Sequence, residues 1–206
     1  MNKSTLAKAV LCTTLLASLS GCVALVVGGA AAGAAATVDR RTLGAQTEDK
    51  AISVKADLRL PKVAGPDSHV NATSYNRQVL LTGEVKEAAA KAAVEKEAKA
   101  IDGVASVANE IIIGGPATYT ARSNDALITG KVKASLVDMK TITATSFKVV
   151  TDKTVVYLMG RVTQREGQVG ADVARSVSGV SKVVKMFEYI SEDEMRALSP
   201  GAKVQL

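Results

Sequence analysis

The chain has 206 residues, of which 26 are Lys or Arg and 20 are Asp or Glu, and its formal net charge is +6. The four Tyr and two Phe, with no Trp, are too few for a surface on which nucleobases stack, because such surfaces are built from aromatic rings. One His and two Cys leave almost nothing for a zinc site or a Cys–His nucleophile. The composition therefore favours binding or structural work, and the positive charge indicates an anionic partner other than nucleic acid.

Residues 1–21 have the pattern of a secretory signal peptide, with two lysines ahead of an apolar stretch. This stretch ends in four residues that resemble a bacterial lipobox: Leu19, Ser20, Gly21 and Cys22. In chains with a lipobox the cysteine becomes the first mature residue and carries acyl chains, so Cys22 is the predicted lipidation site. An uncleaved membrane helix is the alternative, because residues 23–27 prolong the apolar run, and Gly29 and Gly33 have the spacing found in packed membrane helices.

The residue after the cysteine indicates a destination. In the lipoproteins that this N-terminus resembles, an Asp at that position favours the inner membrane, whereas this chain has Val23. The resemblance therefore implies an outer-membrane lipoprotein that faces the periplasm. Residues 22–46 show no helical or strand periodicity and are predicted to be a flexible tether, with an r.m.s. span of about 25–30 Å.

Three segments recur in the same order about 77 residues further along the chain. The matching segments begin at Val54 and Val132, at Leu81 and Leu158, and at Ile101 and Val177. Three ordered matches predict two copies of one small domain. The predicted organisation is a signal peptide at 1–21, a tether at 22–46, a first domain at 47–114, a linker at 115–122, a second domain at 123–191 and a tail at 192–206.

Both copies predict the element order αββαβ. In the first copy, a helix is followed by a hairpin of 70–75 and 78–83, a helix over 86–101 and a strand over 104–113. The second copy predicts a helix with Ser123 or Asn124 as its N-cap, and then two strands. These two strands are predicted at 147–150 and 155–160. A helix that starts with the capping box Thr163–Glu166 follows them, and a strand at 180–190 ends the copy.

The fold class predicted from this order is α+β, with a three-stranded mixed sheet and two helices in each copy. Gly83, Gly103, Gly160 and Gly179 lie at predicted element ends and are expected to be architectural. Residues 191–200 predict a short acidic helix or a disordered tail. No phosphate-binding loop or catalytic constellation occurs, and His69 stands alone, so the sequence predicts no enzyme, no metal and no cofactor.

The repeated pattern resembles a known family. It reads apolar-x-Leu-x-Gly-x-Val, then a helix, then Ala-x-x-Ile/Val-x-Gly-Val-x-x-Val, and this order is similar to the BON domain of exported bacterial proteins. The resemblance covers nearly the whole chain except the tail from Ser191. Two BON-like domains after a lipobox imply a non-catalytic lipoprotein that binds anionic phospholipid, phosphatidylglycerol or cardiolipin, and supports outer-membrane integrity.

The charge divides unequally between the two copies. Residues 47–114 hold nine Lys and Arg against ten Asp and Glu, whereas residues 122–190 hold eleven against six. The second copy is therefore the candidate for contact with an anionic membrane, where each basic residue near the surface contributes about 1 kcal/mol. Periodicity predicts that Ile128, Val132, Ser135, Leu136 and Met139 form the core face of its first helix. Outside this face the helix carries the residues expected to bind lipid, Leu127, Lys131, Lys133 and Val137.

Two interpretations compete with lipid binding at this helix. Leu127 would seal the edge of the core against the tail or the other domain, while the lysines only solvate the helix. Alternatively, the whole chain would be a protein-interaction module that docks envelope-assembly or cell-wall-remodelling partners through its basic domain.

Overall fold

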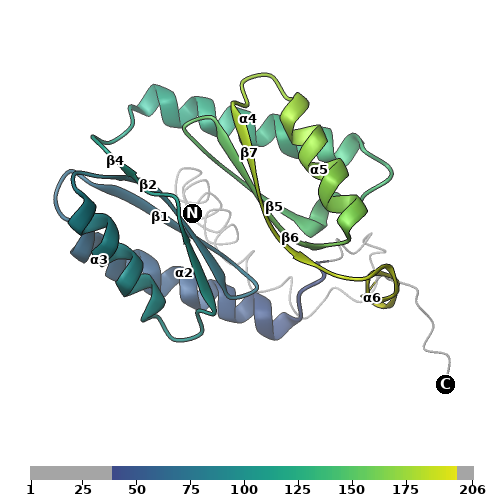
Figure 1. Ribbon diagram of the computed structural model, residues 1–206, viewed down its shortest axis with the longest axis horizontal. Helices are drawn as coiled ribbons and strands as arrows, with labels where there is room; N and C mark the ends of the chain where they lie inside the picture. Colours follow the sequence, from purple (N-terminus) through teal and green to yellow (C-terminus); the bar gives the residue numbers. More distant parts are fainter. Residues whose placement is uncertain (1–38, 199–206) are drawn as a thin grey trace, which may run out of the picture. The chain divides into compact units, whose positions relative to one another are not determined.

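The computed structural model describes residues 39–198, which belong to one compact unit, Val38–Leu206. The predicted signal peptide and Cys22 lie outside the described residues, as does the chain from 199 onward. Two repeats with the same element order follow one another along the described chain (Figure 1).

The first repeat contains two helices and a small mixed sheet. Its elements are α2 (Leu43–Ala64), β1 (His69–Tyr75), β2 (Gln78–Val85), α3 (Ala88–Lys99), β3 (Ser106–Asn109) and β4 (Ile112–Ile113). Strands β1 and β2 form an antiparallel hairpin, and β3 and β4 both pair in parallel with β2. The sequence predicts one continuous last strand. The structure interrupts it after Asn109, whose side chain accepts a hydrogen bond from the amide of Ile111.

The second repeat has the same order of elements and an added C-terminal helix. Its elements are α4 (Tyr119–Asp138), the 3-10 helix η1 (Ala144–Ser146), β5 (Phe147–Asp152), β6 (Val155–Val162), α5 (Gln164–Ser176), β7 (Lys182–Tyr189) and α6 (Glu192–Leu198). Strand β6 pairs antiparallel with β5 and parallel with β7. The capping box of Thr163 and Glu166 is present at the start of α5, as predicted. Of the two states expected for 191–200, the structure shows the helix, as α6.

Two predicted boundaries are wrong for the same reason. Thr42 caps α2 and Thr118 caps α4, and each threonine side chain accepts a hydrogen bond from the third amide after it. Helix α4 therefore begins at Tyr119, not after Ser123 or Asn124, and part of the predicted linker 115–122 is helical. Likewise the flexible tether cannot extend to residue 46, because α2 begins at Leu43 and Arg40 is buried.

Each sheet is covered on both faces. Side chains alternate across a strand, so β2 directs Val79 and Leu81 toward α2 and α3 while Leu80 faces the opposite way. Strand β6 behaves alike, with Leu158 in the core under α4 and α5 and Met159 on the other face. Leu80 and Met159 belong to one buried cluster, to which Tyr75 and Tyr157 also contribute. The two repeats therefore pack through the sheet faces that their own helices leave uncovered.

Two of the predicted architectural glycines allow close approach between hairpin strands. A Cβ at Gly83, where φ is +107°, would lie 1.9 Å from the carbonyl oxygen of His69. A Cβ at Gly160 would lie 2.3 Å from the carbonyl oxygen of Ser146. The sequence predicts these glycines at the turn into the helix, whereas the structure shows that the obstacle is backbone across the hairpin, in β1 for Gly83 and at the end of η1 for Gly160.

A buried aspartate in the first helix of each repeat holds the hairpin turn. Asp125 accepts hydrogen bonds at 2.9 Å from the amides of Lys153 and Thr154. Asp49 accepts the equivalent bonds from the two central turn residues of the first repeat, Asn76 and Arg77. All four turn residues have positive φ, as the type I′ hairpin turn requires, although none is glycine. The carboxylates thus stabilise a backbone conformation that these residues seldom adopt.

Candidate functional site: the outer face of helix α4

Helix α4 divides into a core face and an outer face. Ile128, Val132 and Leu136 are buried against the sheet of the second repeat, as the sequence predicts. At 3.6 residues per turn, the opposite side of the helix presents small or apolar residues that are all exposed: Ser123, Ala126, Leu127, Gly130, Ala134 and Val137. The outer face of α4, as used below, means these six residues together with Tyr119, Lys131 and Lys133.

The four residues predicted to bind lipid all lie on this face. Leu127 is 65% exposed and Val137 is 69% exposed, so neither seals the core. Lys131 and Lys133 are exposed at opposite edges of the face, with the apolar residues between them. The predicted alternative, in which Leu127 closes the edge of the core, does not agree with this exposure.

The structure adds Tyr119, which the sequence analysis missed because it began the helix too late. Tyr119 is the first residue of α4, is 87% exposed and lies in line with Val137 along the outer face. The guanidinium of Arg122 stands 5.6 Å from the centre of its ring. Tyrosine is an amphipathic residue suited to a wet boundary. Recognising Thr118 as the cap would have revealed it.

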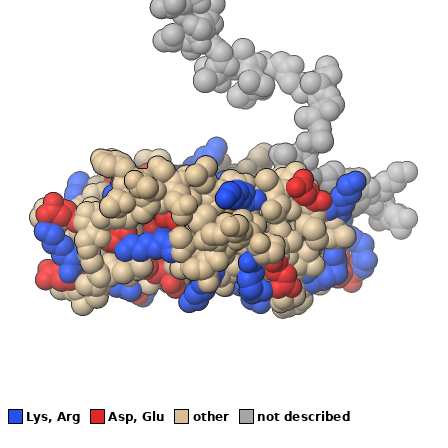
Figure 2. Space-filling view, turned by 90° about the horizontal axis from the view of Figure 1, so that it is seen from above, with Lys and Arg blue, Asp and Glu red and all other residues tan. Residues whose placement is uncertain are grey.

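Helix α4 has two acidic side chains, of which only Asp138 lies on the side of the outer face, between Leu127 and Lys131. Asp125, within the same stretch of helix, is buried and accepts backbone hydrogen bonds at the hairpin turn. Asp138, the last residue of the helix, is exposed. Helix α4 lies along the top of Figure 1, and the face seen from that direction is mostly uncharged, with both basic and acidic side chains scattered over it (Figure 2).

A groove of about 230 Å³ lies beside the C-terminal half of α4. Lys133 and Val137 form its edge on the helix, and the other lining residues are Leu136, Ala144, Thr145, Phe147 and Val149. Leu136, Phe147 and Val149 are core residues, so the floor of the groove is apolar. Lys133 is the only charged residue in the lining.

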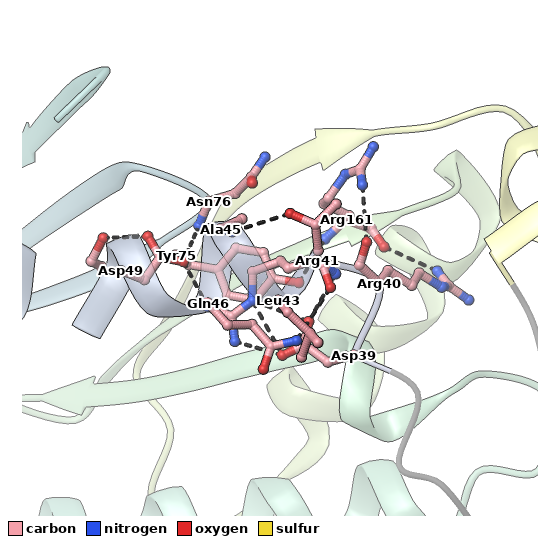
Figure 3. A network of polar contacts seen from close by, with 12 residues as sticks. Asp39, Arg40, Arg41, Leu43, Ala45, Gln46, Asp49, Tyr75, Asn76 and Arg161 are labelled. Carbon is pink, nitrogen blue, oxygen red and sulfur yellow. Dashed lines mark hydrogen bonds and ion pairs between the residues drawn. The ribbon is translucent and has the colours of Figure 1, made fainter. Parts of the chain in front are cut away.

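The residues directly before α2, Asp39 to Thr42, form a strap that joins both repeats (Figure 3). Arg40 donates two hydrogen bonds, of 2.7 and 2.8 Å, to the carboxylate of Glu166 in the second repeat, and both side chains are 3% exposed. Arg41 pairs with Asp49 of the first repeat at 2.7 Å and stacks over the ring of Tyr75 at 4.3 Å. The predicted tether therefore ends in a fixed structure.

Electrostatics support this fixed structure. Burial by itself would raise the pKa of Glu166, but hydrogen bonds from Arg40 and from the amide of Thr163 hold that pKa below its ordinary value. Burial by itself would also raise the pKa of Asp39. The hydrogen bonds and charge of Arg41 outweigh burial, and the charge of Lys148 lowers the pKa further. Lys148 lies on the face of β5 opposite Phe147, beside Arg41 and Asp49, so the strap is on the other side of the sheet from the groove.

Neither a metal centre nor a membrane-spanning helix is found in the part of the chain that the structure describes. Between residues 39 and 198, no three His, Cys, Asp or Glu side chains are grouped as a metal ion would need. None of the helices in this range has the length and hydropathy required to cross a bilayer.

The sequence, repeat and fold define a protein with tandem BON domains. The model of the BON domain family matches residues 49–115 and again residues 124–191, so the chain belongs to this family. The predicted boundaries, 47–114 and 123–191, lie within two residues of these matches.

The chain is also similar to proteins of known name. The chain is 37% identical over 174 residues to the outer membrane lipoprotein DolP of Haemophilus influenzae, covering 84% of this chain and 90% of that protein. It is 32% identical over 155 residues to a 21 kDa hemolysin of Actinobacillus pleuropneumoniae, covering 74% of this chain and 80% of the relative. Among solved structures, CdsD of the Chlamydia trachomatis type III secretion system matches with a TM-score of 0.30 and 13% identity, over 69% of this chain and 97% of that one.

Proposed function

We propose that this protein is a non-catalytic outer-membrane lipoprotein that binds anionic phospholipid, phosphatidylglycerol or cardiolipin, through the outer face of α4, and thereby supports outer-membrane integrity. The predicted lipobox and the name of the DolP relative support the location. The observation that carries the lipid contact is the outer face itself, where exposed Leu127, Val137 and Tyr119 lie between two lysines.

The chemistry of this face suits the boundary between headgroups and acyl chains. An interfacial helix places apolar side chains into that boundary while lysines extend their charged ends toward the headgroups. Near an anionic leaflet each lysine contributes about 1 kcal/mol, which is weak in isolation. Acylation of Cys22 would keep the domain close to the membrane, so a weak contact would suffice.

Vesicle binding tests the proposal. The tested protein should begin at residue 38, because Val38–Leu206 is a compact unit. A chain that begins at residue 47 would lack Arg40 and the Thr42 cap of α2. We expect binding to phosphatidylglycerol vesicles that weakens as salt is added, and little binding to phosphatidylcholine vesicles. Absence of binding to either vesicle, with a protein recovered by crosslinking in the envelope, would support the protein-interaction module instead.

Leu127→Glu tests the site. It should weaken binding to phosphatidylglycerol vesicles at least tenfold, because it adds a negative charge at the centre of the outer face. Thermal unfolding should stay within a few degrees of the parent chain, because Leu127 is exposed. Leu58→Glu is the matched control, since Leu58 is also 65% exposed but lies on α2 of the near-neutral first repeat. Equal losses for both variants, or no loss for Leu127→Glu, would exclude α4 as the contact.

A further inference from the structure

We propose that the groove beside α4 holds one acyl chain of the anionic phospholipid whose headgroup is bound by Lys133. This inference rests on the proposed function and names the part of the lipid that the protein recognises. The outer face alone would sense charge and allow shallow insertion, whereas the groove would take the first methylenes of a single chain out of water.

The lining of the groove is complementary to an amphipathic anion. Its floor is formed by core residues, with Leu136 1% and Phe147 7% exposed, and its rim has one positive charge and no carboxylate. Lys133 and Val137 belong both to this rim and to the outer face, so a lipid bound to the outer face is already at the entrance. An apolar chain with an anionic head satisfies both parts of the site.

The short length of chain between Cys22 and the strap supports a lipid as the occupant. The strap is fixed to the second repeat by the ion pair of Arg40 with Glu166. Only 16 residues separate Cys22 from Asp39, which limits their reach to roughly 55 Å at full extension. If Cys22 is acylated, the membrane is therefore always within reach of this end of the second repeat.

Single-chain lipids too short to form micelles test the inference on residues 38–206. The probes are lysophosphatidylglycerols with six-carbon and eight-carbon chains, the headgroup glycerophosphoglycerol, and octanoate, each titrated while the methyl signals of Ala144 and Val149 are followed by NMR. Each methylene transferred from water strengthens binding up to about fourfold, so the eight-carbon lipid should bind about tenfold more tightly than the six-carbon lipid. Glycerophosphoglycerol should bind too weakly to measure.

A matched pair of variants locates the chain. Ala144→Leu places three more carbons in the groove and should weaken binding of the eight-carbon lipid at least tenfold. Ala89→Leu makes the same change at an exposed position of α3, in the first repeat and outside both the groove and the outer face, and should leave this binding unchanged. The comparison of chain lengths uses the unaltered protein, so it decides the question even if Ala144→Leu fails to fold.

Several results would overturn the inference. In the titrations, these are equal affinity for the two chain lengths, equal affinity for octanoate and the eight-carbon lipid, or unchanged methyl signals of Ala144 and Val149. Among the variants, it is a folded Ala144→Leu protein that binds the eight-carbon lipid as tightly as the parent chain. Failure of the proposed function is distinguishable from these, because it would appear as absent vesicle binding. Chain-length dependence without vesicle binding would retain the groove and reject the membrane contact.

Discussion

At the scale of single residues, the ion pair of Arg40 and Glu166 is the feature with the largest expected energetic effect. Its two side chains are 3% exposed and share two hydrogen bonds, and Arg40 also donates to the carbonyl oxygen of Arg161. Removing one partner of such a pair leaves a buried charge without compensation, which costs about 3–5 kcal/mol. The strap is therefore a structural part of the second repeat, although it precedes the first repeat in the sequence.

We expect Glu166→Gln to lower the free energy of unfolding by about 3 kcal/mol in a urea titration near neutral pH. The exposed pair of Arg175 and Asp172 is the control, and Asp172→Asn should change stability by less than about 1 kcal/mol. Because the pKa of Glu166 is lowered in the folded protein, its contribution is present above the ordinary glutamate pKa and is lost as the pH falls. The difference in free energy of unfolding between the parent chain and Glu166→Gln should become smaller as the pH falls. A difference that does not change with pH would contradict the ion-pair explanation.

At the scale of elements, glycines in α4 and α5 have opposite roles. Gly170 of α5 packs closely on Phe147, and a Cβ there would lie 2.6 Å from a ring carbon. Phe147 is itself held by an edge contact with Phe187, with ring centres 5.7 Å apart. Gly130 of α4 has no atom within 4 Å of the corresponding Cβ position. Close packing thus requires the first glycine, while nothing in the described contacts requires the second.

Gly→Ala substitution at both positions tests this distinction. Alanine stabilises a helix interior by about 1 kcal/mol relative to glycine, so Gly130→Ala should raise the thermal midpoint. Gly170→Ala gains the same helix propensity, but overpacking costs about 1–3 kcal/mol, so its midpoint should fall. Calorimetry of the two variants checks the prediction. A rise for Gly170→Ala would show that the Phe147 ring yields without cost.

At the scale of the whole described unit, the cluster between the two sheets joins the repeats. Leu80 and Met159 are fully buried there, and Tyr75 and Tyr157 lie 5% and 4% exposed. The Tyr75 hydroxyl accepts a hydrogen bond from the amide of Arg161, and the carboxylate of Glu84 pairs with Lys153 at 3.2 Å. Burial, followed by the charge of Glu110, raises the pKa of Tyr157 to about 12. Each repeat therefore supplies part of the other's core.

This packing predicts one cooperative unfolding transition for residues 38–206. Leu80→Ala should lower the free energy of unfolding by about 2–5 kcal/mol. Fluorescence reporters placed in either repeat should show the same shift of the unfolding midpoint. Val54→Ala, at an exposed position of α2, should leave the unfolding midpoint almost unchanged at both reporters. Separate transitions for the two reporters in the parent chain would show that the repeats fold independently.

The sequence alone determined what depends on local periodicity and on repetition. The two copies, their αββαβ order, the capping box at Thr163 and the core face of α4 all follow from spacing along the chain, and the structure confirms them. Leu127, Lys131, Lys133 and Val137 were placed outside the core by the same periodicity, and they are exposed. Their role in lipid binding stays a prediction, because exposure follows from periodicity whereas a ligand does not.

Only the tertiary structure decided what depends on residues distant in sequence. The partner of Arg40 is Glu166, and no local signal links a residue in an apparently structureless segment to the third position of a helix in the other repeat. The groove likewise combines α4, η1 and β5. The surface that covers the second face of each central strand is also found only when the two sheets are seen packed together.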